Sequence, residues 1–298
     1  MKLSVIIVSW NCRDLLARCL DTVFASKLDA DFEVIVVDNS STDGTASIVQ
    51  NNYPQVQLIA SGENAGFARA NNLALRQARG ELILLLNPDT ELEADTLQVM
   101  VDFMDKHPEC GMAGCKVLNP DGTLQLACRR NIPTLADAFF KLSGLSRLFP
   151  RSRRMARYNL TYLPADRVAI VDAVSGSFLM TRREVVNKIG LLDERFFMYG
   201  EDLDWCWRSV RAGYQNYYVP DTSIVHCHGG SSKKRPLRSA YHFYEAMYLF
   251  YDKHFAPRWA RPLVWLAAMA MFFLGLPKMI WRSRVRRAAA AQGRTIRK

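Results

Sequence analysis

Strand and helix patterns alternate through the first third of the chain, and this alternation constrains the fold more than any other feature. Residues 3–8 form an almost continuous apolar run, as expected for a strand that is covered on both faces. Similar short runs at 33–37, 56–60 and 81–86 are separated by helical patterns. Strands that alternate with helices favour right-handed βαβ units. The sequence therefore predicts an α/β fold with a mostly parallel central sheet flanked by helices.

The alternation becomes less regular after residue 86. We predict strands and helices in mixed order: strands at 111–118, 171–180, 217–219 and 223–226, and helices at 94–107, 182–188 and 201–212. The sequence Asn-Pro-Asp-Gly at 119–122 is typical of a hairpin turn. The basic stretch 129–157 has little periodicity, and we expect a mobile loop with short helices there.

Polar residues follow each of the first four predicted strands. Ligands of parallel α/β sheets bind beyond the carboxyl ends of the strands, so these residues are candidates for a binding site. A single such residue before a helix is usually an N-cap, but four consecutive strand ends favour a shared site. The candidates are Ser9, Asn11, Asp38, Ser40, Asn64, Gly66, Arg69, Asn71, Asn87 and Asp89.

The chemistry of these residues suits a nucleotide. The Asp38 carboxylate can accept the ring N–H of a pyrimidine, while Asn64 and Asn71 can hold ribose or phosphate oxygens. Asp89 follows a rigid Asn-Pro step, and a hard divalent cation is usually held by one or two carboxylates together with substrate phosphates. No G-x-G-x-x-G follows the first strand, so the dinucleotide-binding fingerprint is absent.

The stretch FFMYGEDLDWCWR, residues 196–208, places three carboxylates among aromatic residues. Acidic residues are seldom buried unless something pairs with them or uses them. Glu201 and Asp202 could cap the helix predicted there, or they could carry chemistry. Asp204 is expected to pair with Arg208 one turn later.

Seven segments in a fixed order resemble the family 2 inverting glycosyltransferases of the GT-A fold. They are IIVSWN, VIVVDNSSTDGT, ENAGFARANN, LLLNPDT, SGSFLMTRREV, GLLDERFFMYGEDLDWCWR and VHCHGGSS. The resemblance covers roughly residues 1–232, and it is strongest to the rhamnosyltransferase-like branch that builds bacterial surface polysaccharides. It implies a nucleotide-sugar donor, with dTDP-rhamnose as the best guess and a UDP-sugar as the alternative, and Mg²⁺ or Mn²⁺ as cofactor.

The resemblance also implies a role for particular residues. Asp38 resembles the base-recognition Asp of the family, and Asp89 resembles its metal-binding Asp, although only one carboxylate is present in the Asn-Pro-Asp sequence here. His226 resembles a late metal ligand, with His228 as its rival. Asp202 resembles the general base, which takes the proton from the acceptor hydroxyl in an inverting transfer. Glu201 and Trp205 are expected on the acceptor side.

Basic charge is concentrated in particular segments. The chain carries a formal net charge of +10, but residues 1–128 and 158–232 are acidic overall, whereas 129–157, 233–261 and 282–298 are strongly basic. This division predicts an extended anionic partner. The apolar segment 262–281 is barely long enough to span a membrane and has basic clusters on both sides, so we predict that it lies in or re-enters the cytoplasmic leaflet.

These features define the expected organisation of the chain. We expect a GT-A catalytic domain at 1–232, with a nucleotide-sugar half at 1–118 and an acceptor half at 119–232, followed by a membrane-associating region at 233–298. The expected partners are a nucleotide-sugar donor, a lipid-linked saccharide acceptor and an anionic membrane surface, and no nucleic acid. The expected location is the cytoplasmic face of the bacterial inner membrane, and the seven scattered cysteines fit free thiols there.

Two other interpretations fit the sequence less well. A nucleotidyltransferase would need a Gly-rich phosphate loop with Arg and Lys after the first strand, where the chain has Ser-Trp-Asn. A non-catalytic protein that binds nucleic acid or membranes through its basic segments would leave the polar strand ends and Asp202 without a role.

Overall fold

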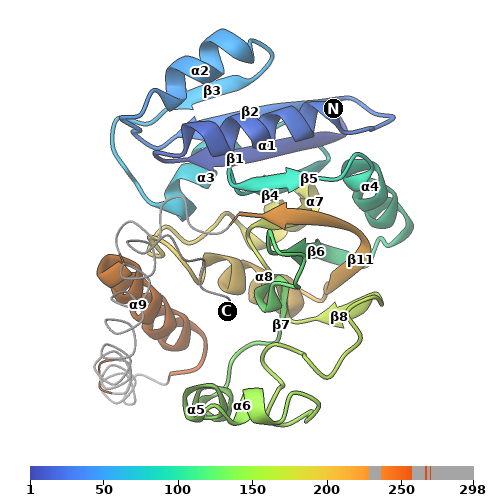
Figure 1. Ribbon diagram of the computed structural model, residues 1–298, viewed down its shortest axis with the longest axis vertical. Coiled ribbons are helices and arrows are strands. Elements are labelled where there is room, and N and C mark those ends of the chain that lie inside the picture. The colour runs from blue at the N-terminus through green and yellow to red at the C-terminus, as the bar shows by residue number, and fades with distance from the viewer. Residues whose placement is uncertain (228–235, 257–265, 267–268, 270–298) are drawn as a thin grey trace.

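A nine-stranded mixed sheet with helices around it forms the centre of the described part of this computed structural model (Figure 1). The structure describes residues 1–227, 236–256, 266 and 269. The strand order is β3-β2-β1-β4-β10-β6-β11-β5, and β8 pairs with β11. Helix α2 and the α5–α6 pair lie at opposite ends of the long axis of the molecule.

The first half of the chain has the predicted alternation. Its strands are parallel to one another: β1 (Leu3–Ser9), β2 (Phe32–Asp38), β3 (Gln57–Ala60) and β4 (Leu82–Leu86). The helices between them are α1 (Arg13–Ala25), α2 (Thr45–Asn52) and α3 (Phe67–Leu75). The carboxyl ends of β1, β2 and β4 therefore lie at one edge of the sheet, which confirms the α/β fold class.

The second half is more irregular. Its strands are β5 (Thr90–Leu92), β6 (Cys110–Leu118), β7 (Arg129–Arg130), β8 (Ala169–Val171), β9 (Ala173–Val174), β10 (Phe178–Arg182) and β11 (Gln215–His226). Its helices are α4 (Thr96–Lys106), α5 (Leu135–Ser143), α6 (Leu145–Leu148), α7 (Arg183–Ile189), α8 (Glu201–Arg211) and α9 (Pro236–His254), with a 3₁₀ turn at Leu126–Cys128.

Two strand predictions were wrong. The expected strand at 171–180 is divided among β8, β9 and β10, because the chain turns at 175–177 and leaves the small β7–β9 ladder to enter the main sheet. The two strands expected at 217–219 and 223–226 are one strand, β11, in which the pairing with β6 shifts between Val219 and Ser223.

The basic stretch 129–157 is only partly as predicted. It contains the short helices α5 and α6, but it begins with two buried arginines, Arg129 and Arg130, on β7. A guanidinium buried in this way needs acceptors, and both side chains find them inside the protein.

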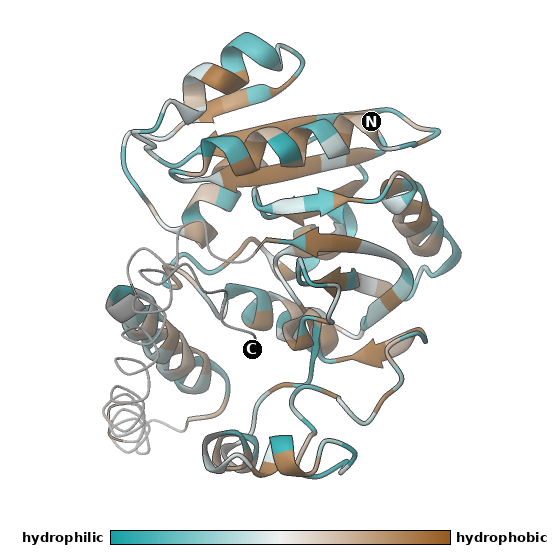
Figure 2. Ribbon diagram, viewed as in Figure 1, coloured by the Kyte–Doolittle hydropathy of each residue, from teal (hydrophilic) through white to brown (hydrophobic). Residues whose placement is uncertain are grey.

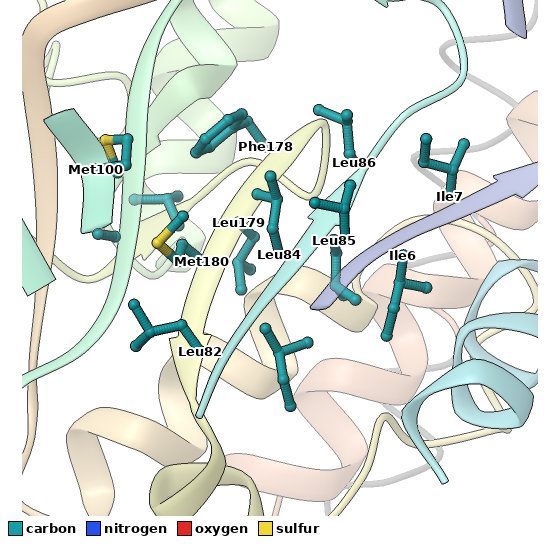
Figure 3. Packing of buried hydrophobic residues seen from close by; sticks show 14 of the residues in the cluster. Ile6, Ile7, Leu82, Leu84, Leu85, Leu86, Met100, Phe178, Leu179 and Met180 are labelled. Atoms are coloured by element: carbon teal, nitrogen blue, oxygen red, sulfur yellow. The ribbon is translucent and has the colours of Figure 1, made fainter. Parts of the chain in front are cut away.

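The core lies on both faces of the central sheet. Figure 3 shows Ile6 and Ile7 of β1 beside Leu84, Leu85 and Leu86 of β4, with Phe178 and Met180 of β10 next to them. These strands are hydrophobic along most of their length, whereas α1 and α2 carry many hydrophilic residues (Figure 2). Burial of both faces explains the nearly continuous apolar runs in the sequence.

The C-terminal predictions fall mostly on residues that the structure does not describe. His228, nearly all of 262–281 and all of 282–298 lie outside the described residues. No helix in the described ranges combines the length and the apolar character that a membrane span requires. Helix α9, which the sequence did not predict, lies within the predicted membrane-associating region and packs on α8 through the ion pairs described below.

Candidate active site

A cavity of about 640 Å³ lies beyond the carboxyl ends of β1, β2 and β4. Its walls come from the strand ends, β7 with α5, Tyr158, the turn at 175–177, the start of α8, and α9. Of the residues predicted from the sequence, it brings together Asn64, Gly66, Asn87, Asp89, Glu201, Asp202 and His226.

The other predicted strand-end residues support the rim of this cavity. Asn11 Oδ1 accepts a hydrogen bond of 2.8 Å from the Thr42 backbone N–H, which ties the loop after β1 to the loop after β2. Asn11 and Ser40 both have positive φ angles, 51° and 64°. Ser9 contacts the thiol of Cys12 at 3.2 Å. These residues shape the two loops rather than line the cavity.

Arg69 and Asn71 also lie away from the cavity wall. Arg69 pairs with Glu63 at 3.0 Å on an exposed surface. Asn71 is buried and donates to the carbonyl of Phe67 one turn earlier in α3. Neither side chain is among those that line the cavity, so the structure does not bring them to the predicted binding site.

Asp38 ends β2 and is buried immediately behind the rim. Its Oδ2 accepts from the Ser41 backbone N–H at 3.3 Å, but its buried Oδ1 has no hydrogen-bond partner among the described residues. A buried carboxylate oxygen without a partner is costly. Asn39, the next residue, lines the cavity and donates to Oδ1 of Asn64 at 3.1 Å.

Gly66 is needed where the loop before α3 passes the segment that leads into α8. Its φ is +84°, and a Cβ atom there would lie 2.6 Å from the carbonyl oxygen of Phe197. Only glycine tolerates both this backbone conformation and this close approach. The contact joins the strand-end loops to the segment that precedes Asp202.

Asp89 and His226 meet at one wall of the cavity. Nε2 of His226 lies 3.0 Å from Oδ1 of Asp89, and its Nδ1 lies 2.9 Å from Oε1 of Gln125. The Gln125 amide is oriented by its NH₂ group, which donates to the backbone carbonyl of His226 at 2.9 Å. The Nδ1 atom therefore donates to Gln125, and Nε2 is the ring nitrogen that faces the Asp89 carboxylate and, at 3.3 Å, the Asn87 amide.

This arrangement fits a divalent cation. A lone pair and a carboxylate oxygen repel each other at 3.0 Å unless a proton or a metal ion lies between them. One His and one Asp are few protein ligands, yet Mg²⁺ is commonly held by one or two carboxylates plus substrate phosphates. No group of three or more His, Cys, Asp or Glu side chains in the described residues could hold a metal by itself.

Asp202 lies in the first turn of α8 and is held by three donors. Its Oδ2 accepts from Arg130 at 2.6 Å and from the Gly176 backbone N–H at 3.0 Å. Its Oδ1 accepts from the Leu203 backbone N–H at 2.7 Å. An ionised carboxylate offers about four acceptor positions, so one remains for a ligand in the cavity.

Glu201 lies beside Asp202 and also lines the cavity. Its side chain is buried, and Oε2 has no hydrogen-bond partner among the residues that the structure describes. Burial, together with the charge of the neighbouring Asp202, raises the pKa of Glu201 to about 8. Glu201 is therefore mostly protonated at neutral pH, whereas Asp202 is paired with a guanidinium.

The backbone before α8 is unusual. Tyr199 and Gly200 have consecutive positive φ angles of 73° and 83°. A left-handed conformation is uncommon for a residue such as tyrosine and is often found at functional sites. The two residues turn the chain so that α8 begins with Glu201 and Asp202 at the cavity.

Trp205 does not lie where the sequence placed it. Its side chain is fully buried, and its indole N–H donates to the Gly190 carbonyl at 2.9 Å, so it does not line the cavity. Asp204 pairs with Arg208 at 2.9 Å, as predicted. Asp204 also accepts from Lys253 and His254, both at 2.7 Å, and these contacts dock α9 on α8.

The wall opposite the strand ends is mainly apolar and comes from α5 and α9. Its apolar side chains include Ala138, Phe243, Ala246, Met247, Phe250 and Tyr251, and Lys141, Arg238 and His242 add cationic or titratable groups. Arg238 lies over the ring of Phe197 at 5.4 Å, and His242 stacks on the same ring at 4.5 Å.

Three functional residues were missed by the sequence analysis. Arg130 lay in a stretch assigned to a loop, Gln125 had no motif to mark it, and Asn39 was noted in a strand-end segment but not selected. No local pattern marks Arg130 in the sequence, because neither its burial nor its partner Asp202, 72 residues later, can be read from the residues around it.

Comparison with known proteins identifies the family. The sequence model described as "Glycosyl transferase family 2" matches residues 4–190. The chain belongs to this family. The protein is thus a glycosyltransferase, and its α/β architecture is the GT-A fold.

Two curated relatives are rhamnosyltransferases. The N-acetylglucosaminyl-diphospho-decaprenol L-rhamnosyltransferase of Mycobacterium tuberculosis is 28% identical over 277 residues, which is 88% of this chain and 89% of the relative. Rhamnosyltransferase WbbL of Escherichia coli is 27% identical over 232 residues, or 74% of this chain and 82% of the relative. The glycosyltransferase is thus similar to these enzymes over most of their length.

A solved structure supports the fold. The mannosyltransferase PcManGT from Pyrobaculum calidifontis, in complex with GDP-Man and Mn²⁺, superposes on the glycosyltransferase with a TM-score of 0.59 and 22% sequence identity. The match covers 99% of this chain and 76% of that structure.

Proposed function

We propose that this glycosyltransferase moves rhamnose from dTDP-rhamnose to a saccharide carried on a prenyl diphosphate, with inversion at the anomeric carbon. The observation that carries the proposal is that Asp89, His226 and Asp202 line one cavity at the strand ends. A cation-binding pair and a candidate base thus share one space with the loops suited to a nucleotide. The similarity to two rhamnosyltransferases supports rhamnose as the sugar.

Asp38 is proposed to recognise the pyrimidine base of the donor. Its buried Oδ1 has no partner among the described residues, and the next residue in the chain, Asn39, lines the cavity. A ring N–H of thymine or uracil would supply the donor that this oxygen lacks, and it would remove the cost of leaving it unpaired. Asn64 and Asn87, which line the cavity, are proposed to contact the ribose and the diphosphate. Ser9, Asn11 and Ser40 are proposed to support the donor by shaping the loops after β1 and β2. Arg69 and Asn71, which lie on α3, do not line the cavity.

Asp89 and His226 are proposed to hold Mg²⁺ or Mn²⁺ together with the donor diphosphate. When bound, such an ion stabilises the negative charge that develops on the leaving diphosphate. Gln125 fixes the ring of His226 so that Nε2 faces Asp89. His228 lies outside the described residues and stays an alternative ligand.

Asp202 is proposed to be the general base. It would accept the proton of the acceptor hydroxyl while the hydroxyl oxygen bonds to the anomeric carbon and the bond from that carbon to the diphosphate oxygen breaks. The electron pair of the broken bond leaves with the nucleoside diphosphate. The three donors on Asp202 fix its carboxylate and leave about one acceptor position for the hydroxyl.

The acceptor is proposed to enter beside α5 and α9. Their apolar side chains would contact the first units of a prenyl chain, and Lys141 and Arg238 would face its diphosphate. A relative whose name includes a diphospho-decaprenol substrate supports this choice. We further propose that residues 233–298 hold the enzyme at the cytoplasmic face of the inner membrane and that Glu201 contacts the acceptor.

Direct assay of the purified protein tests the function. The protein is incubated with Mn²⁺, an N-acetylglucosaminyl diphosphate on a prenyl chain, and dTDP-rhamnose, a UDP-sugar or GDP-mannose in parallel. We expect transfer from dTDP-rhamnose, which mass spectrometry of the lipid detects, and a rise in melting temperature with that donor. Transfer from the UDP-sugar alone would show that the donor is a UDP-sugar and not dTDP-rhamnose. Transfer that Asp202→Ala leaves unchanged would remove Asp202 as the base.

A further inference from the structure

Two adjacent carboxyl groups, Glu201 and Asp202, begin α8 inside the cavity. Both side chains are largely shielded from water: Glu201 is 6% exposed and the Asp202 side chain 13%. Two neighbouring carboxylates in such surroundings repel each other, so one of them favours the protonated form. Which of them keeps the negative charge decides whether α8 presents a base to the acceptor.

The contacts of the two groups are unequal. Asp202 receives the Arg130 guanidinium and two backbone N–H groups. Glu201 has an Oε2 atom for which the described residues provide no donor. Hydrogen bonds and an opposite charge favour the ionised form of the group that receives them. The difference between the two carboxyl groups therefore originates in the hydrogen-bond donors that face Asp202. Arg130 is the only charged donor among these three.

Arg130 is rigidly held. It lies on β7, where it pairs with Ala173 of β9, and its Nη2 atom also donates to the carbonyl of Val174 at 2.9 Å. Burial alone would lower the pKa of the Arg130 guanidinium, but the charge and hydrogen bond of Asp202, together with Tyr158 and Cys206, outweigh this effect and the pKa is raised. A fixed and permanently charged group thus faces one member of the carboxyl pair.

We propose that Arg130 is a positioning residue that assigns the negative charge of the Glu201–Asp202 pair to Asp202. Glu201 then stays protonated beside it and can donate a hydrogen bond into the cavity. This inference rests on the proposed role of Asp202 as the base. It gives the enzyme an ionised base and a neutral acid on consecutive residues.

Other charged groups around the pair do not favour Glu201. Lys141 and Tyr158 line the same cavity, and each interacts electrostatically with Arg130. Asp204, on the same helix, is paired with Arg208, Lys253 and His254. The thiol of Cys206 is buried on the same helix and interacts with Asp202, and His242 lines the α9 side of the cavity, where it stacks on Phe197.

The chain provides a matched control for Arg130. Arg129 lies on the same short strand and is also buried, but it donates to the carbonyls of Leu163 and Pro164 at 2.8 and 2.6 Å. Its guanidinium is thus directed to backbone oxygens instead of the carboxyl pair. Replacement of either arginine by Met removes a buried guanidinium. Only Arg130→Met also removes the positive charge that contacts Asp202, so Arg129→Met controls for the loss of a buried guanidinium itself.

The first experiment measures transferase activity against pH for the full-length enzyme. In Arg130→Met the pH at which kcat/KM falls on the acidic side should rise by about one to three units, because Asp202 loses its positive neighbour. Arg130→Lys should keep most of the wild-type profile. Arg129→Met should keep the wild-type midpoint. Adding Glu201→Gln to Arg130→Met should bring the midpoint back toward the wild-type value.

An unchanged midpoint in folded Arg130→Met, or an equal shift in Arg129→Met, would overturn the proposal. A second measurement does not depend on turnover. Infrared difference spectra at neutral pH should show a protonated carboxyl band that Glu201→Gln removes, and in Arg130→Met a further band that Asp202→Asn removes. If no donor gives turnover but these bands appear, the proposed function fails and the charge assignment stands. If the Glu201 band is missing, the charge assignment fails.

Discussion

Asp89 and His226 meet at 3.0 Å, although 137 positions separate them in the chain. The contact joins the loop after β4 to the last residue of β11. Gln125 determines which nitrogen of the His226 ring faces the carboxylate. The geometry of the proposed metal site therefore depends on Gln125, a residue that need not touch the ion.

Replacement of Gln125 by Ala should weaken metal binding without removing a ligand. Loss of the acceptor for Nδ1 frees the ring to rotate, and removal of such an outer partner typically costs about 10–100-fold in metal affinity. Titration of Mn²⁺ in the presence of dTDP, followed by calorimetry, measures the change. The control is Gln98→Ala, because Gln98 bonds to Asp29 and Asp102 on the surface. Equal affinities in the two variants would contradict the role of Gln125.

Replacement of Asp38 by Asn should weaken binding of the nucleotide. The amide offers an N–H where the ring N–H of the base needs an acceptor, and an unpaired buried group costs about 1–3 kcal/mol. We expect the dissociation constant of dTDP to rise about tenfold or more. Pyrophosphate with Mn²⁺ lacks a base, so its affinity should be unchanged, and a parallel loss for both ligands would show that the substitution damages the loop instead.

Replacement of Asp204 by Asn should destabilise the protein. The Asp204 carboxylate is fully buried and balances Arg208, Lys253 and His254. Its removal leaves Arg208 and His254 without this buried partner and leaves Lys253 paired with Asp193 alone, at a cost of about 3 kcal/mol in the free energy of unfolding. Urea denaturation measures it. The control Asp105→Asn breaks an exposed pair with Lys2 and should cost less than about 1 kcal/mol.

The same cluster sets an acid limit on stability. Burial alone would raise the pKa of Asp204, but the His254 hydrogen bond and the charges of Arg208 and Lys253 hold it below its usual range. A carboxyl whose folded pKa is depressed stabilises the protein above its unfolded pKa, and this contribution is lost as the pH falls through the folded pKa. The difference in stability between wild type and Asp204→Asn should therefore be constant near neutral pH and shrink in acid.

Replacement of Phe243 by Ala should matter only for acceptors with a long apolar chain. Phe243 lines the α9 wall of the cavity and is 42% exposed in the free protein. Loss of a large apolar contact should lower kcat/KM for a prenyl-linked acceptor about tenfold, with little change for the same saccharide on a short alkyl diphosphate. Phe139, exposed on α5 and not part of the wall, provides the control as Phe139→Ala. Equal losses of kcat/KM with both acceptors would contradict the proposed position of the prenyl chain beside α9.

The parallel half of the fold could be predicted because its strands are covered on both faces. Their apolar runs are long and uninterrupted, and each ends in residues that the fold gathers at one edge. Antiparallel and short strands leave weaker patterns. The apolar stretch 171–180 contains the Ser-Gly-Ser turn that divides it, and the pattern did not reveal that β9 and β10 belong to different sheets.

Some residues of the candidate site could be predicted from the sequence because their residue types suit metal binding or acid–base chemistry. Asp89, Asp202 and His226 are of this kind, and they line one cavity. Arg130 and Gln125 act through partners that are 72 and 101 residues away in the chain, and no local pattern encodes such a pairing. Trp205 was misplaced because it shares the face of α8 that carries Glu201 but lies one turn further along the helix, where that face packs in the core instead of lining the cavity.

The salt-bridge cluster around Asp204 has a practical consequence for anyone shortening this protein. A fragment cut at residue 232, after the predicted GT-A domain, would keep α8 yet lose Lys253 and His254, which contact the buried Asp204 carboxylate. Expression of soluble pieces, and chimeras that exchange tails between related enzymes, should therefore retain the chain through residue 254.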